Sequence, residues 1–271
     1  MATEVMPPLG SNPSKLIRGI ELVKPYVSVI NFTDSASANP KMSSLACCKV
    51  AADHNAEAVL QIAARDTTRT GLQATALGAS QFGVKNILCI TGDSAKVGPS
   101  PASDLGFVDI DSIQMLWILR RMRDEGIYLD GRKIKYPPQY FLGAATSPFA
   151  SEPVLQAIRD QKKVNAGAQF FQTNIVFETG RLELWLEELD KRDVLDKVYI
   201  LIGVATLKSY KVARYLHEHV PGVFLPERIM RRMEKAGDRE SEEGVQIALE
   251  FINSIKGMKG INGIHLMTLG W

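Results

Sequence analysis

The stretch Asn86-Ile87-Leu88-Cys89-Ile90-Thr91-Gly92-Asp93 is a short apolar run that stops abruptly at a polar Thr-Gly-Asp sequence. Its length and composition predict a strand buried on both faces, as the strands of parallel sheets are. A helical pattern over residues 69–82 precedes it. Because parallel barrels build their sites from the loops at the carboxyl ends of the strands, we expect chemistry at this end.

The same alternation of apolar runs and helical patterns continues along the chain. We predict eight strands, near residues 4, 29, 60, 88, 142, 172, 201 and 266, with helices between them. The strand over 170–173 is expected to close at Asn174, and one helix is expected over 109–124. Eight is the number at which a parallel barrel closes around its own side chains. We therefore predict an α/β fold, a (β/α)8 TIM barrel that forms a single domain over residues 1–271.

Composition narrows the class of partner. The chain has 32 Lys and Arg against 30 Asp and Glu, and a net charge of +2 predicts no nucleic-acid partner. No apolar run approaches the ~20 residues of a membrane span, and Met1 leads to Glu4 rather than to a basic signal region. The cysteines, Cys47, Cys48 and Cys89, lack metal-ligand spacing and suit a reducing cytosol. We expect a cytoplasmic protein with a small-molecule partner, no membrane association and no metal.

Two acidic residues follow predicted strands. Glu4 precedes Pro7-Pro8, which stop the first strand, and Asp93 ends the fourth. They can face each other across the barrel mouth, one as general acid and one as electrostatic anchor. The alternative, which spacing alone supports equally, makes Glu4 a frayed terminal residue and Asp93 a turn former.

Several other residues could take part in chemistry, but their positions in the sequence favour structural roles. Lys162 and Lys163 can neutralise a phosphate. Lysines near a helix C-terminus also interact favourably with the helix dipole while they stay solvated, and composition favours this second interpretation. His265 lies in the last predicted strand and is expected to be a core histidine. Trp117 and Trp185 occupy apolar helix positions and are expected to pack in the core.

Four segments together resemble the methylenetetrahydrofolate reductase family. They are Glu4-Val5-Met6-Pro7-Pro8, the stretch 86–93, Lys162-Lys163-Val164-Asn165-Ala166-Gly167-Ala168 and His265-Leu266-Met267-Thr268-Leu269. With the polar residues at 31–34 and Arg65-Asp66, the chain is most similar to the branch found in anaerobe one-carbon metabolism and in fusions with homocysteine methyltransferase.

The resemblance implies a barrel that binds FAD, rather than FMN, and reduces 5,10-methylenetetrahydrofolate to 5-methyltetrahydrofolate. Opening the methylene bridge needs an acid that protonates the leaving nitrogen, and Glu4 matches the family's acid. Asp93 matches the residue beside flavin and pterin, where a carboxylate stabilises the cationic iminium carbon.

The resemblance also implies the cofactor contacts. The positions that match flavin contacts are Asn31, Gln61, Thr91, Gly92, Asp93, Ala145, Lys162 and Lys163. The sequence departs from better-known members, which have His at Gln61, Arg at Thr91 and Gln at Asn174. Asn174 is shorter than Gln by one methylene, so its pterin contact is either kept, lost or replaced, for instance by nearby Gln172. Asp93, Gln172 and Asn174 are the expected substrate contacts.

The electron donor is left open between NAD(P)H and a partner protein. Because the chain stops at Trp271, right after the last predicted strand, a partner subunit or a second copy is expected to cover that edge. One alternative is a flavin- or folate-binding barrel subunit of a larger complex, which receives electrons or methyl groups without using NAD(P)H. A further alternative is a folate-dependent methyl carrier without redox chemistry.

Overall fold

A computed structural model describes residues 1–100 and 108–269. In this part of the chain, eight strands in the order β1 to β8 form one closed barrel, and the strand pairs with a defined register are parallel. The predicted (β/α)8 barrel is confirmed. The strands are β1 (Ala2–Glu4), β2 (Val29–Phe32), β3 (Ala58–Ala63), β4 (Asn86–Ile90), β5 (Phe141–Thr146), β6 (Phe170–Ile175), β7 (Tyr199–Ala205) and β8 (Ile261–Met267). The helices are α1 (Ser14–Val23), α2 (Ser44–Asp53), α3 (Arg69–Gln81), α4 (Ser112–Asp124), α5 (Pro153–Ala166), α6 (Gly180–Asp190), α7 (Tyr210–His219), α8 (Glu227–Lys235) and α9 (Glu240–Ile255).

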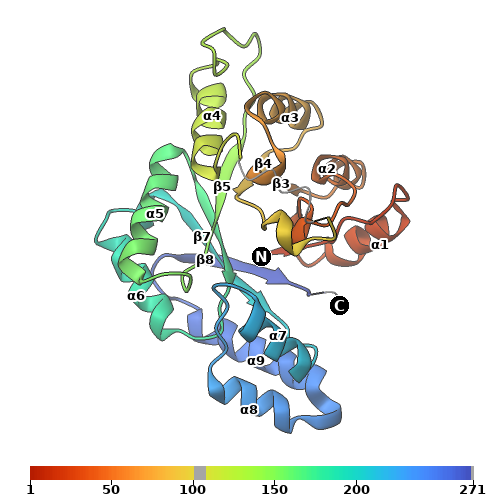
Figure 1. Cartoon of the computed structure of the whole chain (residues 1–271), viewed down its shortest axis with the longest axis vertical. Coiled ribbons are helices and arrows are strands. Elements are labelled where there is room, and N and C mark those ends of the chain that lie inside the picture. Colours follow the sequence, from red (N-terminus) through yellow and green to blue (C-terminus); the bar gives the residue numbers. More distant parts are fainter. Residues whose placement is uncertain (101–107, 270–271) are drawn as a thin grey trace. The chain divides into compact units, whose positions relative to one another are not determined.

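The chain divides into two compact units. The N-terminal unit comprises Ala2–Ala144 and Asn165–Phe170, and the C-terminal unit comprises Ala145–Val164 and Phe171–Trp271 with Met1. A single domain over residues 1–271 therefore stays a prediction. In the N-terminal unit, α1 contacts α2 and α3 contacts α4, while α2 and α4 pack on strands (Figure 1).

An apolar layer fills the inner face of the N-terminal unit. It consists of Val59, Leu88 and Phe170, with Val29, Ile90 and Phe141 packed against them. The rings of Phe141 and Phe170 stack with their centroids 5.3 Å apart. A Cβ at Gly143 would lie 2.2 Å from the Phe170 ring, so only glycine fits beneath it. These contacts fix which face of β3 to β6 points inward, because alternate strand residues share a face.

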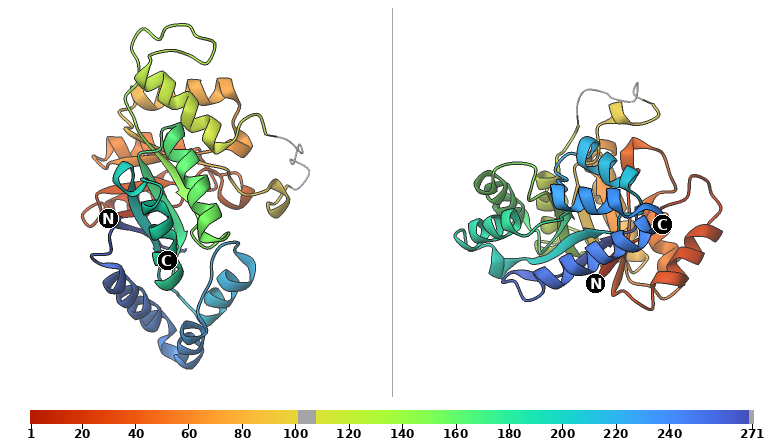
Figure 2. Two further views of the ribbon diagram at one scale, coloured as in Figure 1. Left: turned by 90° about the vertical axis from the view of Figure 1, so that its left-hand side faces the viewer. Right: turned by 90° about the horizontal axis from the view of Figure 1, so that it is seen from below.

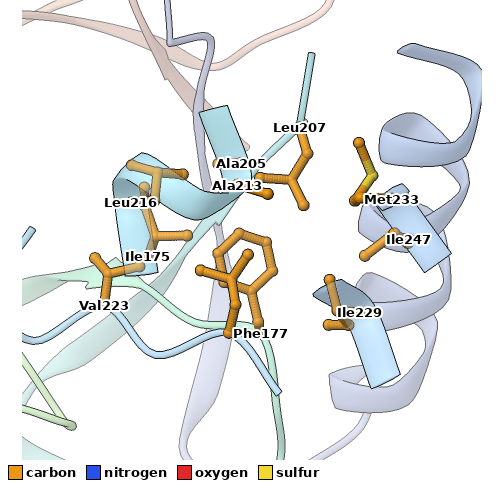
Figure 3. Close-up of a cluster of buried hydrophobic side chains, with 11 residues drawn as sticks. Ile175, Phe177, Ala205, Leu207, Ala213, Leu216, Val223, Ile229, Met233 and Ile247 are labelled. Atoms are coloured by element: carbon orange, nitrogen blue, oxygen red, sulfur yellow. The ribbon is translucent and has the colours of Figure 1, made fainter. Parts of the chain in front are cut away.

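The C-terminal unit has its own core beside three consecutive helices. Helix α8 contacts both α7 and α9, and Figure 2 shows the three grouped in the blue part of the chain. Phe177 lies between side chains of α7 and those of α8 and α9, among them Leu216, Ile229 and Ile247 (Figure 3). Helix α8 carries several Arg and Lys residues and is amphipathic, since it buries Ile229 and Met233.

Three sequence predictions need correction. Helix α4 begins at Ser112 because Asp111 caps it, its side chain accepting from the Gln114 N–H at 2.7 Å. Strand β6 runs to Ile175, so Asn174 lies inside the strand rather than after it. Trp185 is fully buried as predicted, but Trp117 is 40% exposed and lies under the Arg121 guanidinium at 4.8 Å.

Two further expectations meet the limits of the described chain. The segment 94–105 is rich in Ser, Pro and Gly and long for a connection between strand and helix, which predicts that it covers a ligand. Part of this segment and the chain end at Trp271 lie outside the described residues. Among the helices of residues 1–100 and 108–269, none combines the length and apolar character that a bilayer crossing requires.

Candidate functional site at the carboxyl ends of the strands

A polar layer lies above the apolar layer of the N-terminal unit. Moving two residues along a strand returns to the same face, so Asn31 follows Val29 and Gln61 follows Val59 on the inner side. The register pairs Glu4 with Asn31 across β1 and β2, which places the acid beside this layer. The strand geometry therefore brings three predicted site residues together.

Glu4 is a carboxyl group held in a poorly solvated position. Its side chain keeps only partial contact with solvent, and burial raises its pKa from 4.5 to about 7, against a smaller opposing effect of the Lys41 charge. A carboxyl with this pKa is partly protonated at neutral pH. It can therefore donate a proton and leave a carboxylate behind, as a general acid must.

Asn31 and Gln61 are both buried. The Asn31 amide donates to the Thr3 carbonyl at 3.3 Å, and the Gln61 carbonyl accepts from the Ser44 hydroxyl of α2 at 2.7 Å. Helix α2 thus fixes the backbone of β3 at Gln61. Polar side chains this deep in a barrel are costly unless they have partners, so Asn31 and Gln61 are candidates for contact with a ligand.

The turn after β4 carries Thr91, Gly92 and Asp93. Gly92 has φ of +83°, a left-handed conformation that favours glycine. Asp93 is exposed, and its Oδ2 accepts from the Ser37 N–H at 2.7 Å. Glu4 and Asp93 both stand at carboxyl ends of strands of the same unit; that they face each other stays a prediction.

The C-terminal unit holds Ala145 and the two lysines. Lys162 is exposed, whereas the Lys163 ammonium donates to the Ala145 carbonyl at 2.9 Å and to Asp160 Oδ1 at 3.0 Å. Asp160 is fully buried, and its Oδ2 accepts from Trp185 Nε1 at 3.1 Å. The solvated-face interpretation is thus right for Lys162 and wrong for Lys163, because a buried carboxylate draws the latter inward.

Strand β6 carries two amides on one face. Gln172 and Asn174 follow Phe170 at alternate positions. Asn174 is engaged within the protein, since its Nδ2 donates to the Pro221 carbonyl at 3.2 Å and its Oδ1 accepts from the Ile175 N–H at 2.8 Å. Gln172 is buried, and within the described chain neither atom of its amide has a hydrogen-bond partner.

His265 is a buried core residue, as predicted. Burial lowers its pKa to about 4, so the ring is neutral at pH 7. Cys47, Cys48 and Cys89 are free and buried. Within residues 1–100 and 108–269, His, Cys, Asp and Glu side chains form no group of three that could hold a metal ion.

Three charged residues near these positions make contacts that the sequence did not predict. Asp160 could have been found, because it precedes Lys163 by one helical turn. Asp34 accepts from the Ala63 N–H at 3.0 Å, and burial raises its pKa. Arg65, named above only as part of the family resemblance, donates to backbone carbonyls of Ser35 and Asp93. Those contacts span about thirty residues of sequence and carry no local signal.

The fold is a parallel (β/α)8 barrel in which Glu4 ends β1 and buried amides lie within β2, β3 and β6. Barrels of this class form their small-molecule sites at the carboxyl ends of the strands. Residues 1–270 match the family described as methylenetetrahydrofolate reductase, and the chain belongs to that family. The predicted resemblance is confirmed. No curated protein sequence matches the chain.

Solved structures share the fold at low sequence identity. An uncharacterised protein from Clostridium thermocellum that binds two copies of 5-methyl-5,6,7,8-tetrahydrofolic acid is similar with a TM-score of 0.60 and 12% identity, over 99% of this chain and 87% of that one. A riboflavin lyase, solved with modified FMN and riboflavin, gives 0.59 and 9%, over 99% and 86%. A 2,3-dimethylmalate lyase gives 0.51 and 10%, over 98% and 74%.

Proposed function

We propose that the chain reduces 5,10-methylenetetrahydrofolate to 5-methyltetrahydrofolate with a bound flavin. The observation that carries the proposal is Glu4, a carboxyl with a pKa of about 7 at the end of β1 in a chain of the reductase family. The reaction needs a group that holds a proton at neutral pH and gives it to a leaving nitrogen. An ordinary glutamate, with a pKa near 4.5, would hold too few protons for that role.

The acidic surroundings of the β4 turn suit the charge that forms. When the methylene bridge opens, the remaining carbon becomes a cationic iminium centre. Asp93 is proposed to stabilise this charge, and its carboxylate already has one oxygen fixed by the Ser37 N–H. Arg65 is the nearby cation, and it is balanced by Asp66, Asp93 and Asp34.

Gln172 supports a site for a flat ligand with both donors and acceptors. A buried amide without partners costs roughly 1–3 kcal/mol, which a pterin edge would offset by taking both of its hydrogen bonds. Because the protein itself engages Asn174, we assign the pterin contact to Gln172 first and to Asn174 second. The Clostridium thermocellum protein of similar fold binds a methylated tetrahydrofolate, which agrees with a folate ligand.

The residues present also fit a flavin. Ala145 is exposed although it lies within β5, so room remains at that position, and Lys162 offers an exposed ammonium for phosphate. The residues proposed to hold the flavin, as FAD rather than FMN, are Asn31, Gln61, Thr91, Gly92, Asp93, Ala145 and Lys162. Lys163 is proposed to act through the Ala145 carbonyl, to which its ammonium donates. When bound, the flavin supplies a hydride to the methylene carbon.

The absorbance spectrum of the purified protein, recorded before and after adding FAD or FMN, is the first test. A flavin spectrum supports the proposal, and a protein that binds neither flavin returns the chain to flavin-free folate binding. The second test is Glu4→Gln, which is nearly isosteric but cannot donate an acid proton. We expect folate reduction to fall about 10²–10⁴-fold while flavin binding is unchanged.

The electron donor is tested separately. Flavin-loaded protein is mixed anaerobically with NADH, NADPH or dithionite, and flavin bleaching is followed. We propose slow or absent bleaching by both nicotinamides and full bleaching by dithionite, as expected if a partner subunit delivers electrons. Fast bleaching by either nicotinamide makes the chain a self-sufficient reductase.

A cytoplasmic location is proposed from the three free thiols, which a reducing compartment preserves.

A further inference from the structure

Arg65 occupies a central position among the loops that follow β2, β3 and β4. Its side chain is only 12% exposed. Nη1 donates to the Asp93 carbonyl at 2.8 Å, Nη2 donates to the Ser35 carbonyl at 3.2 Å, and Nε donates to Asp66 at 3.0 Å. One planar guanidinium therefore links three separate loops, a task that suits its fixed fork of donors.

The backbone of Arg65 strengthens the same link. Its N–H donates to the Thr91 carbonyl at 3.1 Å, so main chain and side chain together hold the turn 91–93. A Cβ at Gly92 would lie 3.3 Å from Arg65 Nη1 and 3.1 Å from Ala63 Cβ. Glycine at position 92 therefore serves two needs, the positive φ of the turn and the close approach of Arg65.

The loop after β2 is strained and is held from the same side. Ser35, Ser37 and Ala38 have φ of 46°, 55° and 51°, although none of them is glycine. Non-glycine residues keep such conformations only where their surroundings impose them. Two contacts do so here, from Arg65 Nη2 to the Ser35 carbonyl and from the Ser37 N–H to Asp93 Oδ2.

We propose that Arg65 is a positioning residue that fixes the Asp93 carboxylate for the folate reaction, by bracing the 35–38 loop and the 91–93 turn against each other. This inference rests on the proposed function of Asp93. Arg65 acts through Asp93, which it holds by the backbone carbonyl, while the carboxylate points to Ser37. Lysine carries the charge but cannot donate to two carbonyls and a carboxylate in one plane.

The first test does not depend on activity. Hydrogen exchange of the Ser37 amide is compared in wild type, Arg65→Ala, Arg65→Lys and the control Arg132→Ala, whose residue pairs with Asp130 in an exposed ion pair. We expect faster exchange in Arg65→Ala, partial protection in Arg65→Lys and no change in the control. Unchanged protection of Ser37 in a folded Arg65→Ala protein would overturn the proposal.

The second test is a double-mutant cycle on folate reduction. Arg65→Ala is expected to lower the rate by about 10²-fold, as small misplacements of a reacting group do. Since Arg65 acts through Asp93, Arg65→Ala combined with Asp93→Asn should be no slower than Asp93→Asn alone. Fully additive losses would overturn the proposal. If the wild type reduces no folate, the proposed function fails, and the Ser37 amide still decides whether Arg65 braces the loops.

Thermal unfolding followed by circular dichroism controls for loss of fold. Should Arg65→Ala fail to fold, Arg65→Lys and Arg65→Gln carry both measurements, because each keeps part of the hydrogen bonding. In that case either of two results overturns the proposal. One is a Ser37 amide that is as protected as in wild type, and the other is a loss of folate reduction that is additive with the loss in Asp93→Asn.

Discussion

The Nζ atom of Lys163 lies 3.0 Å from Oδ1 of Asp160, a carboxylate with no exposed surface. The same ammonium donates to the Ala145 carbonyl, and Oδ2 of Asp160 also accepts from the Thr146 hydroxyl at 2.7 Å. The charge of Lys163 is therefore balanced inside the protein. Of the two neighbouring lysines, Lys162 is the one left to meet a phosphate from solvent.

Replacing Asp160 by alanine should destabilise the fold strongly. The change leaves Lys163, Thr146 and the Trp185 indole without their shared acceptor, and breaking a buried pair in this way costs about 3–5 kcal/mol. Urea unfolding measures the loss. Asp190→Ala is the matched control, because Asp190 pairs with Lys259 in an exposed bridge worth about 0–1 kcal/mol. Equal losses in both variants would contradict the structural role of Asp160.

Alanine substitutions of Lys162 and Lys163 should have different effects on flavin binding. Lys162→Ala is expected to weaken FMN and FAD binding by roughly 10–100-fold, the range of one hydrogen bond to a charged group, and to leave riboflavin binding unchanged. Lys163→Ala is expected to lower the free energy of unfolding instead, since it leaves the buried Asp160 carboxylate without its ammonium partner. Titration of flavin fluorescence checks the first effect. A loss of riboflavin binding in Lys162→Ala would show that the lysine contacts something other than phosphate.

Glu4 should make the stability of the fold depend on pH. Its folded pKa is about 7 against 4.5 for the unfolded chain, so between these values the folded state binds more protons. The free energy of unfolding therefore falls as pH rises through that window, by up to about 3 kcal/mol. Glu4→Gln should remove this dependence and be more stable than wild type at pH 8. Parallel pH profiles from urea unfolding of the two proteins would contradict it.

Gln172→Leu should weaken folate binding and raise the stability of the fold. Leucine removes a buried amide that has no partner in the described chain, so the melting temperature should rise. Calorimetric titration with 5-methyltetrahydrofolate should show weaker binding, because the pterin loses its contact. Asn174→Ala is the comparison variant, and it should lower stability by about 1 kcal/mol through the lost bond to Pro221. Unchanged folate affinity in Gln172→Leu would remove this residue from the site.

Apolar runs and their polar ends were enough to predict the barrel. The spacing of Leu16, Ile20 and Val23 predicts a helix over 14–23, which is α1, and Glu4 ends its strand as expected, because periodicity is a local property. Trp117 is a residue whose burial could not be predicted from local periodicity. Its neighbours Leu116 and Ile118 are buried, and the orientation of α4 on the strands, which no local pattern fixes, leaves the indole at the edge.

The sequence indicated candidate positions for a site, but it did not indicate the contacts that these residues make. Resemblance and strand ends indicated Glu4 and Asp93, yet a raised pKa depends on how other elements bury the carboxyl group. The contacts of Arg65 join residues from three loops, so only the folded chain brings them together. The same holds for Asp160, whose spacing to Lys163 was visible but whose burial was not.

The stacking of Phe170 over Gly143 and the amides one step further along the strands divide each inward face into two levels. The lower level is constrained by volume, since any side chain at Gly143 collides with a ring. The upper level holds side chains, such as those of Glu4 and Gln172, that the pairing of the strands does not use. Because strand pairing uses the backbone alone, substitutions at these two positions can change the chemistry of the site while the closed barrel is kept.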